Sequence, residues 1–492
     1  MFTDDARYRV WQQVESRGIR AFARFLPLSV FTEAACRCDR RLTSNPLNLM
    51  HLVWIGLGCA LDGASSFATV LTVTFKILAD VPNSPLDPES QLPHLPGRSG
   101  RRLARKAAKK KRSKHHPRRN DPTQVTEEAF AQARAHMPLD FWITLALLLA
   151  DRFAQERDDM IRWKRFRLLA LDGTLVNLPR YQALSDHFGT AKGGHGGRIP
   201  QARMVMLQFP LTRVPYRWAV GPKSQAERTM AEPLLDHLLK DDLLLMDRGF
   251  WSYGYFWRIA QREAFFAIRE IANANLKHLQ TLGPKDSLVR YLPTAPKWRK
   301  LGLPKEMVLR RIRYQVRGFR PSALITNVTD PNVISYQEWV GMTTKHEAGR
   351  VLDDAIYHRR WEIETSFREL KVSQRMKQLR GRTPGTIYYE IGAHVLLYLM
   401  VRWLMAEAAV EYGLDPLRLS FTDALREIKH MARTMVTASP QRVRNVLLPR
   451  LLRRIADYHV PLRPGRHYPR PNDTKVKDLG YGRKKQPTKL VG

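Results

Sequence analysis

Residues 168–174 read Leu168-Leu169-Ala170-Leu171-Asp172-Gly173-Thr174, a short apolar run that ends at an acid. The run predicts a buried β-strand, and the Asp-Gly pair predicts a turn into a second strand from Leu175 to Leu178. Residues 243–249, Leu-Leu-Leu-Met-Asp-Arg-Gly, repeat the pattern. A central sheet would therefore bring Asp172 and Asp247 to its rim or its middle. Either aspartate could instead serve only as a turn former, because Asp is common in turns.

The regions around these strands predict further strands and helices. The expected elements are strands at Met204–Phe209 and Tyr216–Val220, and helices at Glu227–Leu239, from His346, and at Thr386–Ala409. Residues 270–345 alternate strand-like runs with proline and glycine, which is typical of a β-rich segment. We therefore expect a multidomain α and β protein.

The charge of the chain points to a polyanionic partner. Its 492 residues include 82 Lys and Arg against 46 Asp and Glu, a formal net charge of +36. Such an excess is tolerated where nucleic acid or an anionic membrane neutralises it. A membrane-spanning helix needs about 20 apolar residues. The apolar run Leu52–Leu78 carries two charges and the run Phe141–Ala150 is short. We therefore expect no membrane segment and a nucleic-acid partner.

The most basic run lies between Arg98 and Arg119. It contains twelve Lys and Arg residues and no acid, so it cannot bury enough apolar surface to fold alone. It is either a solvated linker or a basic arm that contacts DNA phosphates, and we favour the arm because the flanking chain is basic too. The cations expected to bind DNA include Arg101, Arg102, Lys109, Lys110 and Lys111.

Four polar residues share one edge of a helix predicted over Val351–Arg375. At 3.6 residues per turn they fall within a sector of about 60° beside an apolar face. These residues are Tyr357, Arg360, Glu364 and Lys371. The edge is either a functional surface or an ion-pair ladder between Arg360, Glu364 and their neighbours.

Two aspartates and a distant glutamate, brought together, would form an all-oxygen site. Such a site suits Mg²⁺, which prefers carboxylate and water ligands. Paired divalent ions can activate water or a 3′-hydroxyl and stabilise the leaving oxygen of a phosphodiester. Asp172, Asp247 and Glu364 are therefore candidate ligands for Mg²⁺, with Mn²⁺ as the alternative.

The spacing of these residues resembles a known family. The residues Tyr357, Arg360, Glu364 and Lys371 match the Tyr-Arg-Glu-Lys signature of the insertion sequence 4 (IS-four) family of DDE transposases. Residues 171–174 and 247–250 are similar to the family's contexts for its two aspartates, and so are residues 188–190 followed by 200–203. The matching segments run from about residue 20 to residue 410.

The resemblance implies roles for individual residues. Asp172, Asp247 and Glu364 would be the catalytic metal ligands. Phosphate or other DNA contacts would come from Tyr357, Arg360, Lys371 and Arg248. Some members of the family hold a flipped base on a tryptophan of an inserted domain, and Trp339 and Trp298 are the candidates here. Both tryptophans could instead be core or surface aromatics.

The resemblance also implies an RNase H-like catalytic core interrupted by a β-strand insertion, between helical N-terminal and C-terminal regions. The expected parts are a helical DNA-binding domain (1–96), a basic linker or arm (97–122), a helical connection (123–165), the first part of the core (166–270), the β-rich insertion (271–345), the second part of the core (346–410) and a basic C-terminal region (411–492).

The function implied is cut-and-paste DNA transposition, with metal-dependent cleavage at the ends of the element and strand transfer to target DNA. A homodimer in a synaptic complex and a cytoplasmic, nucleoid-associated place in a prokaryote would follow. Two alternatives stay open. One is a catalytically silent DNA-binding protein derived from a transposase, and the other is an RNase H-like nuclease without strand transfer.

Overall fold

The computed structural model describes residues 22, 24–40, 47, 49–62, 126–192, 198–315, 321–341, 355–438 and 440–460. The predicted basic arm, with Arg101, Arg102 and Lys109 to Lys111, lies outside these residues. So do the first turns of the helix predicted from His346.

The strands in this part of the chain form one mixed sheet of eleven strands. Its order is β3-β4-β2-β6-β7-β11-β10-β9-β8, with β1 paired to β2 and β5 paired to β4. The strands are β1 (Arg162–Trp163), β2 (Phe166–Asn177), β3 (Thr190–Lys192), β4 (Arg198–Phe209), β5 (Val214–Pro222), β6 (Asp242–Met246), β7 (Phe265–Arg269), β8 (Leu276–Gly283), β9 (Asp286–Tyr291), β10 (Met307–Tyr314) and β11 (Ser322–Thr326). The pairs β2·β6 and β6·β7 are parallel, while the other pairs among these strands are antiparallel. The fold is therefore mixed α and β, as the sequence predicts.

The turn predicted at Asp172-Gly173-Thr174 is wrong. β2 runs without interruption from Phe166 to Asn177, and its residues Asp172 and Gly173 pair with Met206 and Val205 of β4. A continuous ladder on β4 satisfies the backbone polar groups that a turn would otherwise have to redirect. The Asp-Gly pair therefore lies inside a strand.

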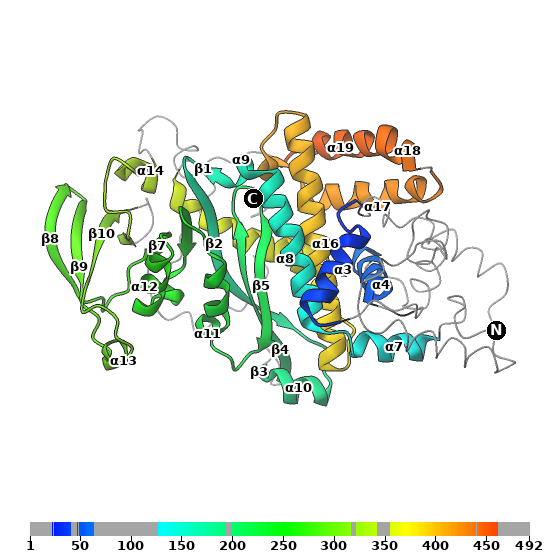
Figure 1. The fold of residues 1–492 in the computed structure, drawn as a ribbon, viewed down its shortest axis with the longest axis horizontal. Helices are drawn as coiled ribbons and strands as arrows, with labels where there is room; N and C mark the ends of the chain where they lie inside the picture. Colours follow the sequence, from blue (N-terminus) through cyan, green and yellow to red (C-terminus); the bar gives the residue numbers. More distant parts are fainter. Residues whose placement is uncertain are drawn as a thin grey trace, which may run out of the picture.

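The β-rich segment joins the same sheet as the catalytic candidates. The strands β8, β9, β10 and β11 follow one another antiparallel, and Leu324 to Thr326 of β11 pair with Arg269 to Ala267 of β7. Figure 1 shows β8 to β10 at one end of the sheet, far from the C-terminal helices. The strands predicted over 270–345 are confirmed, whereas the domain boundaries stay a prediction.

Helices make up most of the remaining described residues. The α-helices are α3 (Leu28–Arg37), α4 (Leu49–Asp62), α7 (Glu127–Ala135), α8 (Leu139–Glu156), α9 (Asp158–Ile161), α10 (Gln182–Phe188), α11 (Glu227–Ala231), α12 (Tyr253–Gln261), α13 (Pro296–Lys300), α14 (Tyr336–Val340), α15 (Glu362–Arg368), α16 (Pro384–Glu411), α17 (Phe421–Thr437), α18 (Pro440–Arg442) and α19 (Leu448–Asp457). The 3₁₀ and π segments are η2 (Glu232–His237), η3 (Arg248–Phe250), η4 (Ile356–Trp361), η5 (Glu369–Ser373), η6 (Met376–Gln378), η7 (Pro416–Arg418) and η8 (Val443–Leu447).

Two segments that the sequence predicts as continuous α-helices contain 3₁₀ or π turns. The helix expected over Glu227–Leu239 ends as an α-helix at Ala231 and continues as 3₁₀ helix η2, whose first turn contains Pro233. Proline has no N–H to donate and its ring crowds the preceding turn, so the α-helix stops there. The segment that carries Glu364 is 3₁₀ in η4, α in α15 and π in η5. A uniform rotation of 100° per residue therefore does not describe it.

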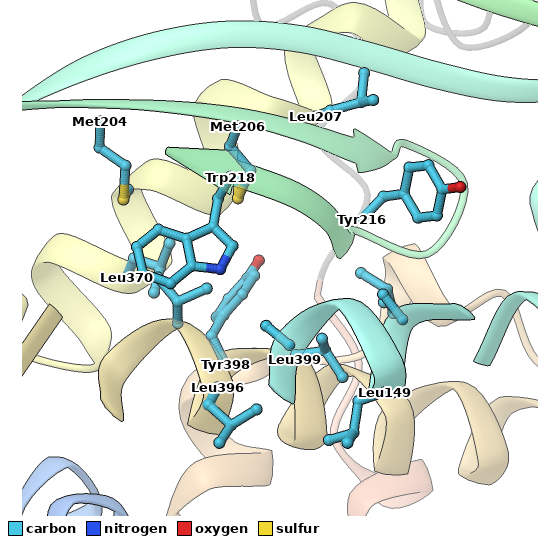
Figure 2. Close-up of a cluster of buried hydrophobic side chains, with 14 of the residues drawn as sticks. Leu149, Met204, Met206, Leu207, Tyr216, Trp218, Leu370, Leu396, Tyr398 and Leu399 are labelled. Carbon is cyan, nitrogen blue, oxygen red and sulfur yellow. The ribbon is translucent and has the colours of Figure 1, made fainter. Parts of the chain in front are cut away.

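Helices cover both faces of the sheet. Met204 and Met206 of β4 point toward Leu396 and Leu399 of α16, as Figure 2 shows. α11 lies on the other face. Gly221 of β5 pairs with Arg203, whose side chain points away from the face of Met204. A Cβ atom at Gly221 would lie 3.6 Å from Met230 Cε of α11. The part of the sheet formed by β4 and β5 is thus covered by α16 on one side and by α11 on the other.

Helix α16 corrects the expectation that no segment is long and apolar enough to span a membrane. It meets both criteria by length and composition, but 89% of its most apolar 18-residue window is buried inside the protein. Thr383 and Thr386 form a capping box at its start, with Pro384 in the first turn. α16 is therefore a buried core helix in this fold.

Candidate functional site

Asp172 and Asp247 lie at neighbouring positions on adjacent strands. β2 and β6 pair in parallel, and their last paired residues are Leu171 and Met246. The two aspartates directly follow that pair, one inside β2 and the other just beyond the end of β6. This register agrees with the sequence-based expectation that one sheet brings the two carboxylates together.

Glu364 is linked to Asp172 by the side chain of Arg360. Arg360, in η4, is only 3% exposed. Its Nη1 lies 3.5 Å from Asp172 Oδ2, and its Nη2 donates to Glu364 Oε1 at 3.1 Å. The predicted ion pair between Arg360 and Glu364 therefore exists, but it also includes a carboxylate of the sheet and is more than a ladder along one helix.

The pKa of Asp172 is raised to about 6, first by burial and then by the neighbouring carboxylates of Glu227 and Glu364. The Gly173 N–H, which donates to Asp172 Oδ1 at 2.8 Å, and the charge of Arg360 oppose this rise. Negative charge at Asp172 is thus only partly compensated, a setting that favours a further cation.

Asp247 has a cationic partner of its own. Arg269 Nη2, from the end of β7, donates to Asp247 Oδ1 at 2.8 Å. Burial opposes ionisation of Asp247, but this hydrogen bond and the charges of Arg360 and Arg269 outweigh it, so that its pKa lies below the ordinary value. The two aspartates therefore differ in environment, and Asp247 is the more firmly ionised one.

Tyr357 and Lys371 join the segment that carries Glu364 to the strands β2 and β6. The Tyr357 hydroxyl donates to the Met246 carbonyl at 2.9 Å, directly before Asp247. Lys371 Nζ donates to Thr174 Oγ1 and to the Leu175 carbonyl, the latter at 3.3 Å. Burial and the charge of Lys377 lower the pKa of Lys371. Both predicted phosphate-binding residues thus contact β2 or β6 close to the two aspartates.

A partly buried ionic network holds the helix that carries Glu364. Arg213, in the β4–β5 turn, donates to Glu362 Oε2 at 2.6 Å and to Glu369 Oε1 at 3.0 Å. Glu369 also accepts from Arg402 and, at 2.7 Å, from the Tyr398 hydroxyl of α16. The helix is therefore tethered at both ends of α15. Sequence patterns did not indicate this network, because its partners lie far apart in the chain.

Three further predicted DNA-contacting residues, Trp339, Trp298 and Arg248, lie in the described part of the chain. Trp339, in α14, is 1% exposed and packs in a hydrophobic cluster, which is the core alternative for this residue. Trp298, in α13, is half-buried, and its ring would lie 2.6 Å from a Cβ atom at Gly254. Arg248 is exposed at the start of η3, next to Asp247.

Glu227 and Arg269 are site residues that sequence patterns did not identify. Glu227, the first residue of α11, lies 3.8 Å from Arg203 of β4, and burial together with the charge of Asp247 raises its pKa. The sequence signal that could have indicated the close approach of Glu227 is Gly173. The sequence pattern favours a turn at this glycine, whereas β2 continues through it.

The donor set matches the chemistry of a divalent cation. The three candidates are all carboxylates, the ligand type that Mg²⁺ prefers. A cationic group, the Arg360 guanidinium, already contacts Asp172 and Glu364. Among the residues that the structure describes, no three Asp, Glu, His or Cys side chains are arranged to hold an ion as they stand. The three carboxylates therefore suit a divalent cation by ligand type, and a cation held by all three would require these side chains to rotate.

Comparisons with known proteins relate this part of the chain to a family. Residues 163–400 match the model of the transposase DDE domain. The chain is 28% identical over 320 residues to transposase InsG for insertion sequence element IS4 of Escherichia coli (strain K12), which covers 63% of this chain and 68% of that protein.

A solved structure, the piggyBac transposase synaptic complex with hairpin DNA, covers 82% of this chain and 75% of that one at 9% identity. Its TM-score of 0.33 is too low for the likeness to bear on the fold or the function.

The matched domain spans β2, β6 and the Glu364 helix, so it contains all three candidate carboxylates. The family implies an enzyme that acts on DNA with a divalent cation, and the two alternatives, a silent DNA-binding protein and a nuclease without strand transfer, are not favoured. Residues 163–400 therefore match a transposase DDE domain, which agrees with the resemblance of the sequence to the IS4 family of DDE transposases, enzymes that cleave DNA and transfer the cut strand.

Proposed function

We propose that the protein moves an insertion sequence by a cut-and-paste reaction in which Asp172, Asp247 and Glu364 hold the divalent cation, Mg²⁺ or Mn²⁺. One observation carries this proposal. Two aspartates follow the last paired residues of adjacent parallel strands, and Arg360 links the first of them to Glu364. When bound, the cation supplies Lewis-acid activation of the attacking oxygen and neutralises charge at the phosphodiester.

The chain's own residues then divide the remaining work. Arg360 and Lys371 orient the DNA phosphate, since a guanidinium offers a planar fork and an ammonium a point charge. Tyr357 acts through the main chain, because its hydroxyl holds the Met246 carbonyl and so sets the position of Asp247. Arg213 keeps the Glu364 helix in register through Glu362 and Glu369.

The partners in this proposal are the ends of the element and the target DNA, bound by a homodimer in a synaptic complex. The net charge of +36 supports extensive phosphate contact. Arg248 beside the site and the basic arm around Lys109 supply further cations for the DNA. A cytoplasmic, nucleoid-associated location in a prokaryote fits this role. The core is taken to be RNase H-like, which the parallel β2·β6 pair supports.

Cleavage of the element's own end DNA in Mg²⁺ tests the proposal. Asp172→Asn, Asp247→Asn and Glu364→Gln should each abolish cleavage and leave end binding in EDTA nearly intact, because the amides keep the shape but lose the charge. Glu232→Gln, an exposed site, is the control. An amide variant that cleaves at the wild-type rate removes that residue from the ligand set. Cleavage without joining of the 3′ end would favour a nuclease.

A further inference from the structure

Gly173 follows Asp172 at a point where no side chain fits. A Cβ atom at Gly173 would lie 1.8 Å from Glu227 Oε1 and 2.6 Å from Glu227 Cδ. The φ angle of Gly173 is not positive, and β2 pairs with β4 regularly through it. The glycine is therefore required for the close approach of a carboxylate and not for a turn.

Glu227 approaches β2 from the face opposite Asp172. Neighbouring residues of a strand point to opposite faces, so the missing side chain of Gly173 is on the α11 side. β6 ends at Met246, which pairs with Leu171, and no described strand pairs with that edge of β2 beyond Leu171. The Glu227 carboxylate therefore lies over Gly173, where β2 has no partner strand on the β6 side, and it is near enough to both aspartates for their charges to interact.

The charges around Glu227 are incompletely matched. Its cationic partner, Arg203, lies 3.8 Å away, beyond hydrogen-bond distance, and Arg203 Nε is buried without a hydrogen-bond partner. Glu227 acts more strongly than Glu364 on the pKa of Asp172, and Asp247 acts in turn on that of Glu227. Repulsion among these carboxylates raises the free energy of the folded protein, and a cation shared by them would remove that repulsion.

We propose that Glu227 is a fourth acidic residue of the catalytic site, which helps Asp172 and Asp247 to hold the divalent cation, and that Gly173 is present to admit its carboxylate. Mg²⁺ keeps several water ligands, and Glu227 accepts hydrogen bonds from them. The inference rests on the proposed function, since it takes Asp172 and Asp247 as ligands. The competing role for Glu227 is that of a purely structural partner of Arg203.

Titration of the full chain with Mn²⁺ alone separates the two roles, by calorimetry and by the thermal midpoint of unfolding. Glu227→Gln should weaken Mn²⁺ binding about 10-fold, the usual effect of losing an outer partner of a metal site. In EDTA the variant should be at least as stable as the wild type, because one of three repelling carboxylates is gone. Glu232→Gln, whose side chain pairs with Arg258 on the surface, is the matched control and should change neither quantity.

Gly173→Ala supplies a second and independent test. The new methyl group displaces the Glu227 carboxylate, so this variant should weaken Mn²⁺ binding about as much as Glu227→Gln does. The double variant should be no weaker than either single one, because both remove the same interaction.

The same titration contains Asp172→Asn to separate this inference from the proposed function. Unchanged Mn²⁺ affinity in Glu227→Gln, with affinity lost in Asp172→Asn, overturns the inference alone. Unchanged affinity in Asp172→Asn overturns the proposed ligand set. A lower midpoint of Glu227→Gln in EDTA, with wild-type Mn²⁺ affinity, identifies Glu227 as a structural partner of Arg203.

Discussion

The guanidinium of Arg360 lies 3.5 Å from the carboxylate of Asp172, although one residue belongs to a 3₁₀ segment and the other to a strand of the central sheet. Arg360 is almost fully buried, so this contact is shielded from water. The same guanidinium donates to Glu364. One arginine therefore links two of the three carboxylates proposed to bind the cation, and its removal has effects that differ from those of removing a ligand.

Arg360→Ala should lower the rate of end cleavage about 100-fold, the usual loss for one charge-stabilising donor. Mn²⁺ binding should be at least as tight as in the wild type, because Asp172 and Glu364 lose a competing cation. Single-turnover cleavage and Mn²⁺ titration measure the two effects. Arg359→Ala, at the preceding position of η4, is the control. Weaker Mn²⁺ binding with unaltered end binding would contradict this division of roles.

Asp172→Asn should raise stability in EDTA at pH 8. The folded-state pKa of Asp172 is about 6, above the unfolded value near 4. The protonated Asp172 carboxyl therefore favours folding fully below about pH 4, and this stabilisation is lost as the pH rises through 6. Above that pH the ionised carboxylate lowers the free energy of unfolding by up to about 3 kcal/mol. The advantage of the variant should shrink below pH 6, as urea unfolding at pH 8 and pH 5 measures.

The control for this pH dependence is Asp158→Asn. Asp158 pairs with Arg162 on the surface, and such pairs contribute less than about 1 kcal/mol. An Asp172→Asn variant that is destabilised equally at pH 8 and pH 5 would show that burial and neighbouring carboxylates do not raise the pKa of Asp172.

Arg402→Met should destabilise the protein by about 3 kcal/mol, because it leaves the buried carboxylate of Glu369 with one cation fewer. Arg402 is fully buried in α16 and donates to Glu369 in η5, next to the helix that carries Glu364. Urea unfolding measures the loss. Arg262→Met, which breaks a surface pair with Asp236, should cost less than about 1 kcal/mol. Similar losses in both variants would refute the distinction.

Removal of residues 101–112 should flatten the salt dependence of DNA affinity. Each phosphate contact changes the slope of log K against log salt by about 0.9 in duplex DNA. The segment includes Arg101, Arg102 and Lys109 to Lys111. Replacing it with a Gly-Ser linker of equal length keeps the spacing. An unchanged slope would make the segment a spacer.

Local sequence patterns were sufficient to predict the elements with strong signals. Apolar runs that end at an acid predicted the strands before Asp172 and Asp247, and the apolar period predicted α16. These signals work because burial of apolar side chains in strands and helices follows their spacing in the chain. The spacing of Tyr357, Arg360, Glu364 and Lys371 likewise indicated the family. The roles of these four residues at the site stay predictions.

Only the tertiary structure decided which distant groups meet. The Asp-Gly pair was interpreted as a turn, because the sequence does not reveal that β4 continues alongside β2 or that Glu227 fills the space over Gly173. The links from Arg360 to Asp172 and from Arg213 to Glu369 join residues from separate elements. Such contacts depend on the packing of the whole chain, whereas the sequence by itself determines local periodicity, charge and motif spacing.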